Sequence, residues 1–587
     1  MDPHITVIIG AGPAGLTAAY ELSKLERQSL VLEEQNTVGG LARTEDHKGF
    51  YFDLGGHRFF TKAKAVESIW REVLGADFLR RPRLSRIYYN RKFFYYPLKP
   101  LNALSGLGLW RSLLIGLSYL RWQLLPHRRE ETFEQWVTNR FGKRLFETFF
   151  KAYTEKVWGL SCSELRAEWA AQRIRGLSLK TVVISMFAKP NQTIKTLIEE
   201  FHYPRLGPGM MWQAVKENIE QNGSVVRLNC KVVAVRHDDT HVESVVVSNN
   251  GLSEVIRGSA FVSSIPVNEF VLKLDPPPPA NVIRAAEGLR YRGLLVVCLI
   301  INEADLFPDN WIYIHDPEVR VGRIQNYKNW SPDMVPDSGK TSLGMEYFCT
   351  PGDGLWTLSD ADLIVLGQSE LERIGLAPAA KVEDAHVIRV PHAYPVYDAE
   401  YSDNIALIRQ FLDGLKNFQT IGRNGLHRYN NQDHAMMTGL LAARNLALGE
   451  RNDLWNVNTE PEYHEEALLE EQAVEDALAR IFTRLDRVAF GLSLGTVAGA
   501  ALFLGTLFLA VKGGDGMARS LQLLRQYFPG YRVTPLGSVM GFVYAFAGGF
   551  ISGWSFAFLR NATMFLYMAW LERKAQRGLM RRIFDFL

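Results

Sequence analysis

The sequence predicts an α/β fold with a Rossmann-type dinucleotide-binding domain, an inserted α+β domain and a C-terminal pair of membrane-length helices. Three observations predict it: a glycine-rich turn after the first strand, β-rich segments that return to that domain later in the chain, and two long uncharged runs near the C-terminus. The 587 residues exceed one ordinary domain of about 100–200 residues.

The glycine-rich turn predicts a site for a dinucleotide diphosphate. An apolar strand from Ile5 to Ile9 leads into G-A-G-P-A-G, and a helix follows. Gly10 permits the tight turn, Gly12 lets the backbone approach a pyrophosphate, and Gly15 lets the helix contact the strand. The helix N-terminus favours the negative charge of the diphosphate. A second strand, S-L-V-L-E, ends in Glu33, whose carboxylate can accept hydrogen bonds from ribose hydroxyls.

Two further glycine pairs favour FAD over a nicotinamide dinucleotide as the predicted cofactor. Gly39 and Gly40 lie in V-G-G-L-A-R-T and are followed by Arg43, which either neutralises the diphosphate or stands at the surface as a structural residue. Gly55 and Gly56, in F-D-L-G-G-H-R-F-F-T, let the backbone lie against a flavin ring. A second glycine pair with a following arginine is typical of enzymes that bury a whole FAD. The sequence therefore predicts FAD in a glutathione-reductase-like domain.

Later segments return the chain to this domain. Val225 to Arg236 reads as strands, and in this superfamily the backbone near Val233 reaches the adenine; Ala260 to Val267 reads as a buried strand. We therefore expect a discontinuous FAD-binding domain and a substrate domain built from two insertions. The predicted boundaries are 1–90, 200–270 and 385–460 for the FAD-binding domain, 91–199 and 271–384 for the substrate domain, 461–487 for a helical stalk, and 488–587 for a membrane module.

Charge and cysteine usage exclude several functions. Lysine and arginine number 66 against 63 acidic residues, a net charge of +3, so nothing in the overall charge favours nucleic acid. The cysteines are scattered without metal-ligand spacing, so neither a metal site nor a disulfide framework is expected, and a reducing compartment suits them. No signal peptide is expected before the first strand. The cysteines are Cys162, Cys230, Cys298 and Cys349.

Two uncharged segments near the C-terminus predict membrane spans. Val488 to Val511 has 24 residues and Pro535 to Leu559 has 25, and about 20 apolar residues cross a bilayer. The alternative is a pair of buried core helices. Small residues at every fourth position predict a packed pair, formed within one chain or as a homo-oligomer between chains. They are Gly491, Gly495 and Gly499 in the first segment, and Gly541, Ala545, Gly549 and Gly553 in the second.

Basic residues flank both segments, and a third apolar stretch lies earlier in the chain. Arg487 precedes the first span and Arg560 follows the second, so the positive-inside rule places the catalytic domain on the cytoplasmic side of the membrane. The earlier stretch, Leu104 to Pro126, is interrupted by Arg111 and Arg121. We expect it to be a core or partner helix, with a membrane-docking face as the alternative.

A polar cluster stands at the head of a long apolar helix near the end of the FAD-binding segments. It reads G-R-N-G-L-H-R-Y-N-N-Q-D-H. Gly422 lets the backbone approach the cofactor, while Gln432 and Asp433 are expected to face the flavin or to cap the helix. Arg423 and Tyr429 are expected to face substrate, because an arginine fork matches phosphate oxygens and a tyrosine adds a neutral donor.

Five segments together resemble UDP-galactopyranose mutase, a flavoenzyme of the amine oxidase and protoporphyrinogen oxidase-like superfamily. They are G-G-L-A-R-T with F-D-L-G-G-H, Y-T-E-K-V-W-G-L, L-R-Y-R-G, R-I-Q-N-Y-K with M-E-Y, and the polar cluster. The resemblance covers roughly residues 5 to 445, and the C-terminal membrane module is not part of the usual mutase. A second histidine that prokaryotic mutases often carry is Phe60 here.

The resemblance implies that reduced FAD is a covalent catalyst that exchanges the ring size of a diphosphate sugar. It implies that two arginines and two tyrosines hold the diphosphate, and that His57 faces the flavin through its backbone. No general base is required, because the flavin makes the bond. The arginines are Arg292 and Arg423, the tyrosines Tyr394 and Tyr429, and further substrate contacts are Trp158, Tyr153, Tyr327 and Asn431.

Three functions stay open at this point. The first is a mutase-type isomerase acting on a nucleotide sugar or a lipid-linked sugar diphosphate, and the two predicted spans favour the lipid variant. The second is a FAD-dependent oxidoreductase of amine oxidase or desaturase type with a hydrophobic substrate, since one fold hosts both chemistries. The third is a membrane scaffold that only retains FAD.

Overall fold

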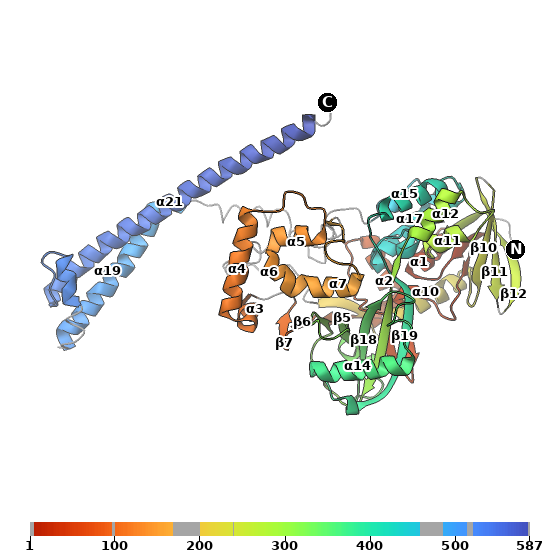
Figure 1. The fold of residues 1–587 in the computed structure, drawn as a ribbon, viewed down its shortest axis with the longest axis horizontal. Helices are drawn as coiled ribbons and strands as arrows, with labels where there is room; N and C mark the ends of the chain where they lie inside the picture. The colour runs from red at the N-terminus through yellow and green to blue at the C-terminus, as the bar shows by residue number, and fades with distance from the viewer. Residues whose placement is uncertain are drawn as a thin grey trace. The chain divides into compact units, whose positions relative to one another are not determined.

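The chain forms two compact units, Met1–Ala467 and Leu468–Leu587. The first has a mixed α/β fold, which confirms the predicted fold class, and the second carries the C-terminal helices (Figure 1). Residues 461–484 of the predicted stalk lie outside the described part of the chain. The computed structural model describes residues 5–96, 100–167, 200–238, 240–249, 251–457, 485–512 and 521–584.

A five-stranded parallel sheet lies at the centre of the nucleotide-binding side of the first unit. Its order is β20-β13-β1-β2-β9, and every neighbouring pair is parallel. Its strands are β1 (Thr6–Ile9), β2 (Ser29–Leu32), β9 (Val225–Arg227), β13 (Ala260–Ser263) and β20 (Phe418–Thr420). Three parts of the sequence that are far apart along the chain therefore meet in one sheet.

Alternate residues of these strands face two different layers. Ile8 and Val31 belong to a core with α1 (Pro13–Lys24) and α17 (Gln432–Leu448), while Val7 and Leu30 face the opposite core. Helix α17 packs very closely on α1: a Cβ atom at Gly439 would lie 2.3 Å from the carbonyl oxygen of Ala14. Parallel strands covered on both faces are expected to be apolar throughout, as these are.

Further elements complete the two layers. On the α1 side the helices are α2 (Lys64–Leu74) and α10 (Pro208–Gln221). The opposite layer contains β10 (Lys231–His237), β11 (Val242–Asn249), β12 (Leu252–Arg257), β14 (Leu274–Asp275), α11 (Val267–Leu272), α12 (Ala280–Gly288) and α15 (Tyr401–Leu412).

A seven-stranded sheet forms the second half of the first unit. Its central strands, β15 (Tyr291–Ile301) and β18 (Thr341–Cys349), are buried along their whole length. The other strands are β6 (Ser85–Tyr89), β7 (Lys92–Tyr95), β16 (Trp311–Ile314), β17 (Arg323–Asn326) and β19 (Val382–Pro395), in the order β19-β15-β18-β17-β16-β6-β7. The boundaries predicted at 90 and 385 fall inside the β6–β7 hairpin and inside β19, which both belong to this sheet.

Helices lie on both sides of the seven-stranded sheet (Figure 1). One side has α14 (Asp360–Ile374). The other has the helices that follow β7. They are α3 (Pro100–Leu107), α4 (Leu109–Leu124), α5 (Phe133–Phe141), α6 (Lys143–Phe146), a π-helical turn (Glu147–Lys151) and α7 (Ala152–Trp158). Two short antiparallel pairs, β3 (Thr44–His47) with β4 (Phe50–Asp53) and β5 (Phe78–Pro82) with β8 (Glu200–Pro204), complete the unit.

The second unit consists mainly of α19 (Arg487–Lys512) and α21 (Pro535–Phe584). Two helical stretches, Arg487–Lys512 and Pro535–Thr563, are long and apolar enough to cross a membrane, with mean hydropathies of 2.1 and 1.5. The predicted helix pair forms within one chain. A Cβ atom at Gly549 would lie 2.9 Å from Cα of Gly495. The small residues therefore let the two backbones touch.

Candidate functional site

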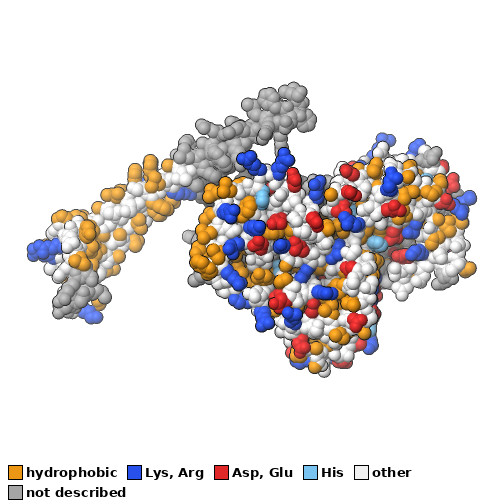
Figure 2. Space-filling model, in the orientation of Figure 1, with side chains coloured by type: hydrophobic (Ala, Val, Ile, Leu, Met, Phe, Trp, Pro, Cys, Tyr) orange, Lys and Arg blue, Asp and Glu red, His pale blue; other side chains and the backbone are white. Residues whose placement is uncertain are grey.

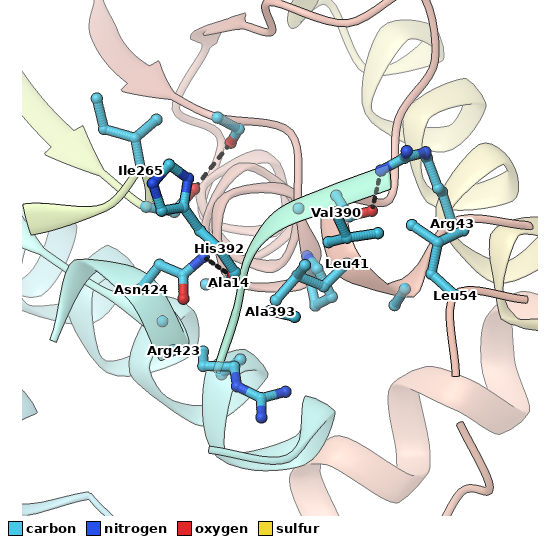
Figure 3. Close-up of a pocket in the computed structure, with 18 of the residues that line it drawn as sticks. Ala14, Leu41, Arg43, Leu54, Ile265, Val390, His392, Ala393, Arg423 and Asn424 are labelled. Carbon is cyan, nitrogen blue, oxygen red and sulfur yellow. Dashed lines mark hydrogen bonds between the residues drawn. The ribbon is translucent and has the colours of Figure 1, made fainter. Parts of the chain in front are cut away.

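A cavity of about 410 Å³ lies beside the carboxyl ends of β1 and β2 in the first unit. This edge of a parallel sheet is where open α/β folds bind ligands. Its wall is formed by the turn after β1, the end of β2, the loops around residues 40–43 and 54–60, the end of β19 and the start of α17 (Figure 3). Among the described residues, no group of His, Cys, Asp or Glu could hold a metal ion.

Glycines bring the backbone close together at one end of this cavity. Gly10 has φ +98° and donates its N–H to the carbonyl of Leu32 at 2.8 Å. A Cβ atom at Gly40 would lie 3.1 Å from Cα of Gly12. The loop that contains Gly40 can therefore approach the turn after β1 this closely only without a side chain at that position. A Cβ atom at Gly15 would lie 2.0 Å from the carbonyl oxygen of Gly10, which excludes any side chain there.

Glu33 is buried at the end of β2. One carboxylate oxygen accepts the N–H of Ala11 at 2.7 Å and the other accepts the N–H of Gln35 at 3.0 Å. Burial raises the pKa of this carboxyl, although both hydrogen bonds oppose the shift. Each oxygen keeps a lone pair that can accept a hydroxyl proton from a ligand in the cavity.

Near the predicted adenine contact at Val233, the residue that lines the cavity is Val232. Val232 lines the cavity, whereas Val233 does not line it and is 43% exposed. The pairing of β10 with β11 skips one residue between Val232 and Ala234, so Val233 sits at a β-bulge. A bulge turns the local backbone and re-aims side chains, which sequence alternation alone does not reveal.

Arg43 and the glycine pairs border the middle of the cavity. Arg43 donates to the carbonyl of Gly40 at 3.1 Å (Figure 3). It also pairs with Glu45 at 2.6 Å. Gly39 has φ +105° and donates to the carbonyl of Ala11 at 2.9 Å, which joins this loop to the first turn. Gly55 and Gly56 also line the cavity.

Arg423 occupies the other end of the cavity between aromatic rings. Its guanidinium carbon lies 4.1 Å from the ring centre of Tyr429 and 4.9 Å from that of Tyr394. The two tyrosine rings are stacked with their centres 5.7 Å apart, and the ring centre of Trp158 lies 6.1 Å from that of each tyrosine. Two buried guanidinium nitrogens of Arg423 have no hydrogen-bond partner among the described residues. Figure 3 shows this side chain and Asn424 leaving the same helix in different directions.

A buried ion pair, which the sequence analysis did not single out, supports this end. Arg323 donates from Nε to Glu346 at 2.8 Å, and the Gln325 amide donates to the same carboxylate at 2.8 Å. Burial opposes the charge on Arg323, but Glu346 holds its pKa well above the usual value. Arg323 also lines the cavity. The signal in the sequence was the pair of polar residues Arg323 and Gln325 on alternate positions of the segment R-I-Q.

His57 lies between these cations and is uncharged at neutral pH. Burial, together with the charges of Arg423 and Arg323, lowers its pKa to about 4. Its Nε2 atom has no hydrogen-bond partner among the described residues. The cavity end therefore offers cations and a neutral imidazole, and it lacks a paired anion beside Arg423.

The structure places four of the predicted substrate residues away from the cavity. Trp158 is buried and packs against Tyr394 and Tyr429 without lining the cavity itself. The other three have partners elsewhere. Arg292 is buried, and its guanidinium donates to three backbone carbonyls and to Thr350 Oγ1 at 2.6 Å. Tyr153 stacks on His315 at 4.8 Å. Tyr327 donates its hydroxyl to the carbonyl of Asp53 at 2.8 Å. None of the three lines the cavity.

The N-terminus of α17 closes the cavity near Gly422. Asn431 is the N-cap and forms a capping box with His434, while Gln432 and Asp433 line the cavity. Gln432 Oε1 is buried without a hydrogen-bond partner among the described residues. Burial raises the pKa of Asp433 to about 7. Gly422, with φ +80°, donates to Thr438 Oγ1 at 2.9 Å.

The site fits FAD along its length. Glycines admit a diphosphate, Glu33 can accept ribose hydroxyls, and Gln432 Oε1, which has no hydrogen-bond partner among the described residues, lines the cavity at the N-terminus of α17 and could accept a hydrogen bond from a flavin. Fold and site together define a flavoprotein.

The chain belongs to the flavin containing amine oxidoreductase family, whose model matches residues 13–447. FAD is accordingly its cofactor. A 15-cis-phytoene desaturase of Arabidopsis thaliana is 24% identical over 421 residues, which cover 67% of this chain and 71% of the desaturase. The L-amino acid oxidase bordonein-L of Crotalus durissus terrificus is 25% identical over 315 residues, 50% of this chain and 57% of the oxidase.

Solved structures share the fold. A reduced UDP-galactopyranose mutase superposes with a TM-score of 0.66 at 21% identity and covers 78% of this chain and 98% of its own. A protein from an Exiguobacterium species described as a protoporphyrinogen oxidase superposes with a TM-score of 0.60 at 16% identity. The superposition covers 77% of this chain and 100% of that protein. At these identities the likeness concerns the fold, and the chemistry must be argued from the site.

Proposed function

We propose that the protein is a membrane-anchored FAD enzyme that isomerises the ring of a sugar carried on a diphosphate, as a mutase does. The observation that carries the proposal is Arg423, whose guanidinium has two unpaired buried nitrogens on the wall of the FAD cavity. A buried cation without a partner is costly, so the site favours a ligand that supplies the anion.

The other arginines near this end of the cavity are already paired, so Arg423 is the group that would bind the anion. Arg323 is already neutralised by Glu346, which is fully buried. Arg292 has hydrogen-bond acceptors around its whole guanidinium. A planar guanidinium can donate two parallel hydrogen bonds to phosphate oxygens, and the stacked tyrosines hold its plane in place. One arginine therefore replaces the pair expected from the sequence.

The side chains around the cavity bind and orient the substrate. Bound FAD in its reduced form supplies the nucleophile for the anomeric carbon. Arg423 would hold the diphosphate while it is a leaving group and keep it in place for its return. His57 is neutral at pH 7, so it adds a polar group but no charge to this end of the cavity. Tyr394 and Tyr429 form an aromatic wall that can cover a sugar face and exclude water, and the buried Trp158 packs against both rings.

A redox function is the second candidate, and the family favours it. The flavin containing amine oxidoreductases and the desaturase and oxidase relatives give it direct support. In that case Arg423 would bind a carboxylate or diphosphate of a hydrophobic substrate, and FAD would accept its electrons. The unpaired Arg423 argues against a substrate that is purely hydrocarbon.

One experiment separates these candidates. The dithionite-reduced protein is incubated with UDP-galactopyranose or with polyprenyl-diphosphate sugars, and ring isomers are resolved by chromatography. A mutase converts at least one of them, and borohydride traps a flavin–sugar adduct. Net bleaching of oxidised flavin by a substrate under anaerobic conditions, with no isomer formed from any sugar, overturns the mutase proposal in favour of the oxidoreductase.

We also propose that α19 and α21 anchor the protein in a membrane, with the FAD-binding unit on the cytoplasmic side. Their length and apolar surface support spanning, because the two stretches are only 22% and 11% buried within the described chain. The glycine faces of α19 and α21 contact each other within one chain, so a homo-oligomer would have to form through other surfaces of these helices. Proteolysis of oriented membrane vesicles tests the sidedness: the cytoplasmic unit is cleaved only in inverted vesicles.

A further inference from the structure

Helix α4 (Leu109–Leu124) of the first unit exposes an apolar stripe. Spacings of three and four residues place its large apolar side chains on one face of the helix. Each of them is between 54% and 80% exposed, although their type is usually buried. They are Trp110, Leu113, Leu117, Leu120 and Leu124. Figure 2 shows hydrophobic side chains gathered at the edge of the unit where Figure 1 places this helix.

The stripe belongs to a helix that is held on its opposite face. A Cβ atom at Gly142 would lie 2.8 Å from the backbone nitrogen of Tyr119, so α4 rests directly on the start of α6. Ser118 Oγ accepts the N–H of Arg144 at 3.3 Å, and the Gln123 amide donates to the carbonyl of Asn139 at 2.8 Å. The apolar face is therefore presented in a fixed orientation.

The charged residues within the segment that carries the stripe are all positive. From Pro100 to Arg129 the sequence contains no aspartate or glutamate, and the first acidic residue is Glu130. The basic residues of this stretch are Arg111, Arg121, Arg128 and Arg129, and each is exposed. The guanidinium of Arg121 lies 5.8 Å from the ring centre of Trp122, at the border of the stripe. An apolar face flanked by arginines matches an interface of acyl chains below anionic headgroups.

We propose that the α4 stripe docks on the surface of an anionic lipid bilayer. The inference rests on the proposed function in one respect: α19 and α21 would hold the unit close to that bilayer. Docking would place the FAD unit against the membrane, where a substrate with a lipid tail is found.

A fluorescent label on the stripe tests this in the full chain. All four native cysteines are buried, so a cysteine introduced at Leu117→Cys can be labelled selectively with NBD. The matched control is Val365→Cys, on α14 of the same unit, because Val365 is 63% exposed. A third variant, Val497→Cys in α19, reports on the spans. The proteins are reconstituted in nanodiscs with phosphatidylglycerol, with or without acyl-chain spin-labelled lipid, and flavin absorbance checks the fold.

The proposal expects a blue shift at position 117 and a loss of emission with spin-labelled lipid, with neither change at position 365. Replacing phosphatidylglycerol by phosphatidylcholine should reduce both changes. Equal behaviour at 117 and 365 overturns docking. A blue shift at 117 without lipid quenching also overturns it and identifies a protein partner, such as a second copy. Quenching at 497 without quenching at 117 supports the membrane spans and overturns docking of the α4 stripe. Quenching at 117 without quenching at 497 supports docking and overturns the membrane spans.

Discussion

The two ends of the cavity are built in different ways. The cofactor end is mostly backbone: Gly10, Gly12 and Gly40 bring loops together, and the first residues of α1 line the cavity. The substrate end is made of side chains from remote strands and loops, with Arg423, Tyr394 and Arg323 contributed by three separate elements. The first kind of site tolerates little change in shape, while the second can alter its ligand by changing single side chains. This difference explains how one family can keep FAD and vary its substrates.

The largest effect is expected from a change in the backbone end. Gly15→Val places a side chain where a Cβ atom would lie 2.0 Å from the carbonyl oxygen of Gly10. That atom is backbone and cannot move aside, so we expect the protein to be purified without bound flavin. The absorbance of the purified protein in the flavin region measures this. Gly354→Ala is the control, because the space around Gly354 is open; loss of flavin in both variants would contradict this explanation.

A large loss of stability is expected from the buried pair under the substrate end. Glu346→Ala leaves Arg323 charged and buried without its partner, which costs about 3–5 kcal/mol of unfolding free energy. Denaturant unfolding followed by tryptophan fluorescence measures the change. The matched control is Glu383→Ala, since Glu383 pairs with Lys340 at the surface and should cost at most about 1 kcal/mol. Equal losses would mean that the Arg323 site is solvated.

The comparison of two arginines is a sharper test of the substrate end. Arg423→Ala should weaken UDP binding by about 1.5–3 kcal/mol, or roughly 10–100-fold, with stability little changed, because Arg423 has unpaired donors in the cavity. Arg292→Ala should instead lower stability and leave UDP affinity within a few fold, since it removes contacts to Thr350 and three carbonyls. Calorimetric titration and thermal unfolding of both variants separate the two effects. The reverse outcome would assign the anion to Arg292.

The smallest effect is a pH dependence that His57 gives to anion binding. The pKa of His57 in the free site is about 4, held down by burial and by two arginines. An anion beside Arg423 offsets that repulsion and raises the pKa, so the protonated form binds the anion more tightly. UDP affinity should therefore rise as pH falls through the pKa of the complex, by at most about tenfold per pH unit for one proton.

His57→Gln should flatten this pH dependence, because it keeps a polar side chain and removes the titrating ring. Affinity for UDP is measured by titration at several pH values in both proteins, with flavin absorbance to confirm that FAD stays bound. An identical slope in the variant would show that another group, such as Asp433 with its raised pKa of about 7, takes up the proton.

The sequence by itself determined the cofactor end and the helix pair. Gly10, Gly12, Gly15 and Glu33 act within one strand–turn–helix–strand unit, so their spacing already fixes their roles. The glycine spacing in α19 and α21 is likewise local, and the predicted pair forms with those residues in contact. The resemblance to mutases and amine oxidases rested on such short segments, and the family match agrees with it.

Only the tertiary structure decided which polar residues face the cavity. Arg292 and Arg423 look alike in sequence, but Arg292 sits on β15, where α7 and the end of β18 supply four acceptors, while Arg423 lines the cavity against two tyrosine rings. Glu346 and Arg323 meet only because β17 and β18 pair in that register. A bulge at Val233 moves the lining to Val232. These outcomes depend on strand pairing between distant segments, and one sequence read locally carries no information about that register.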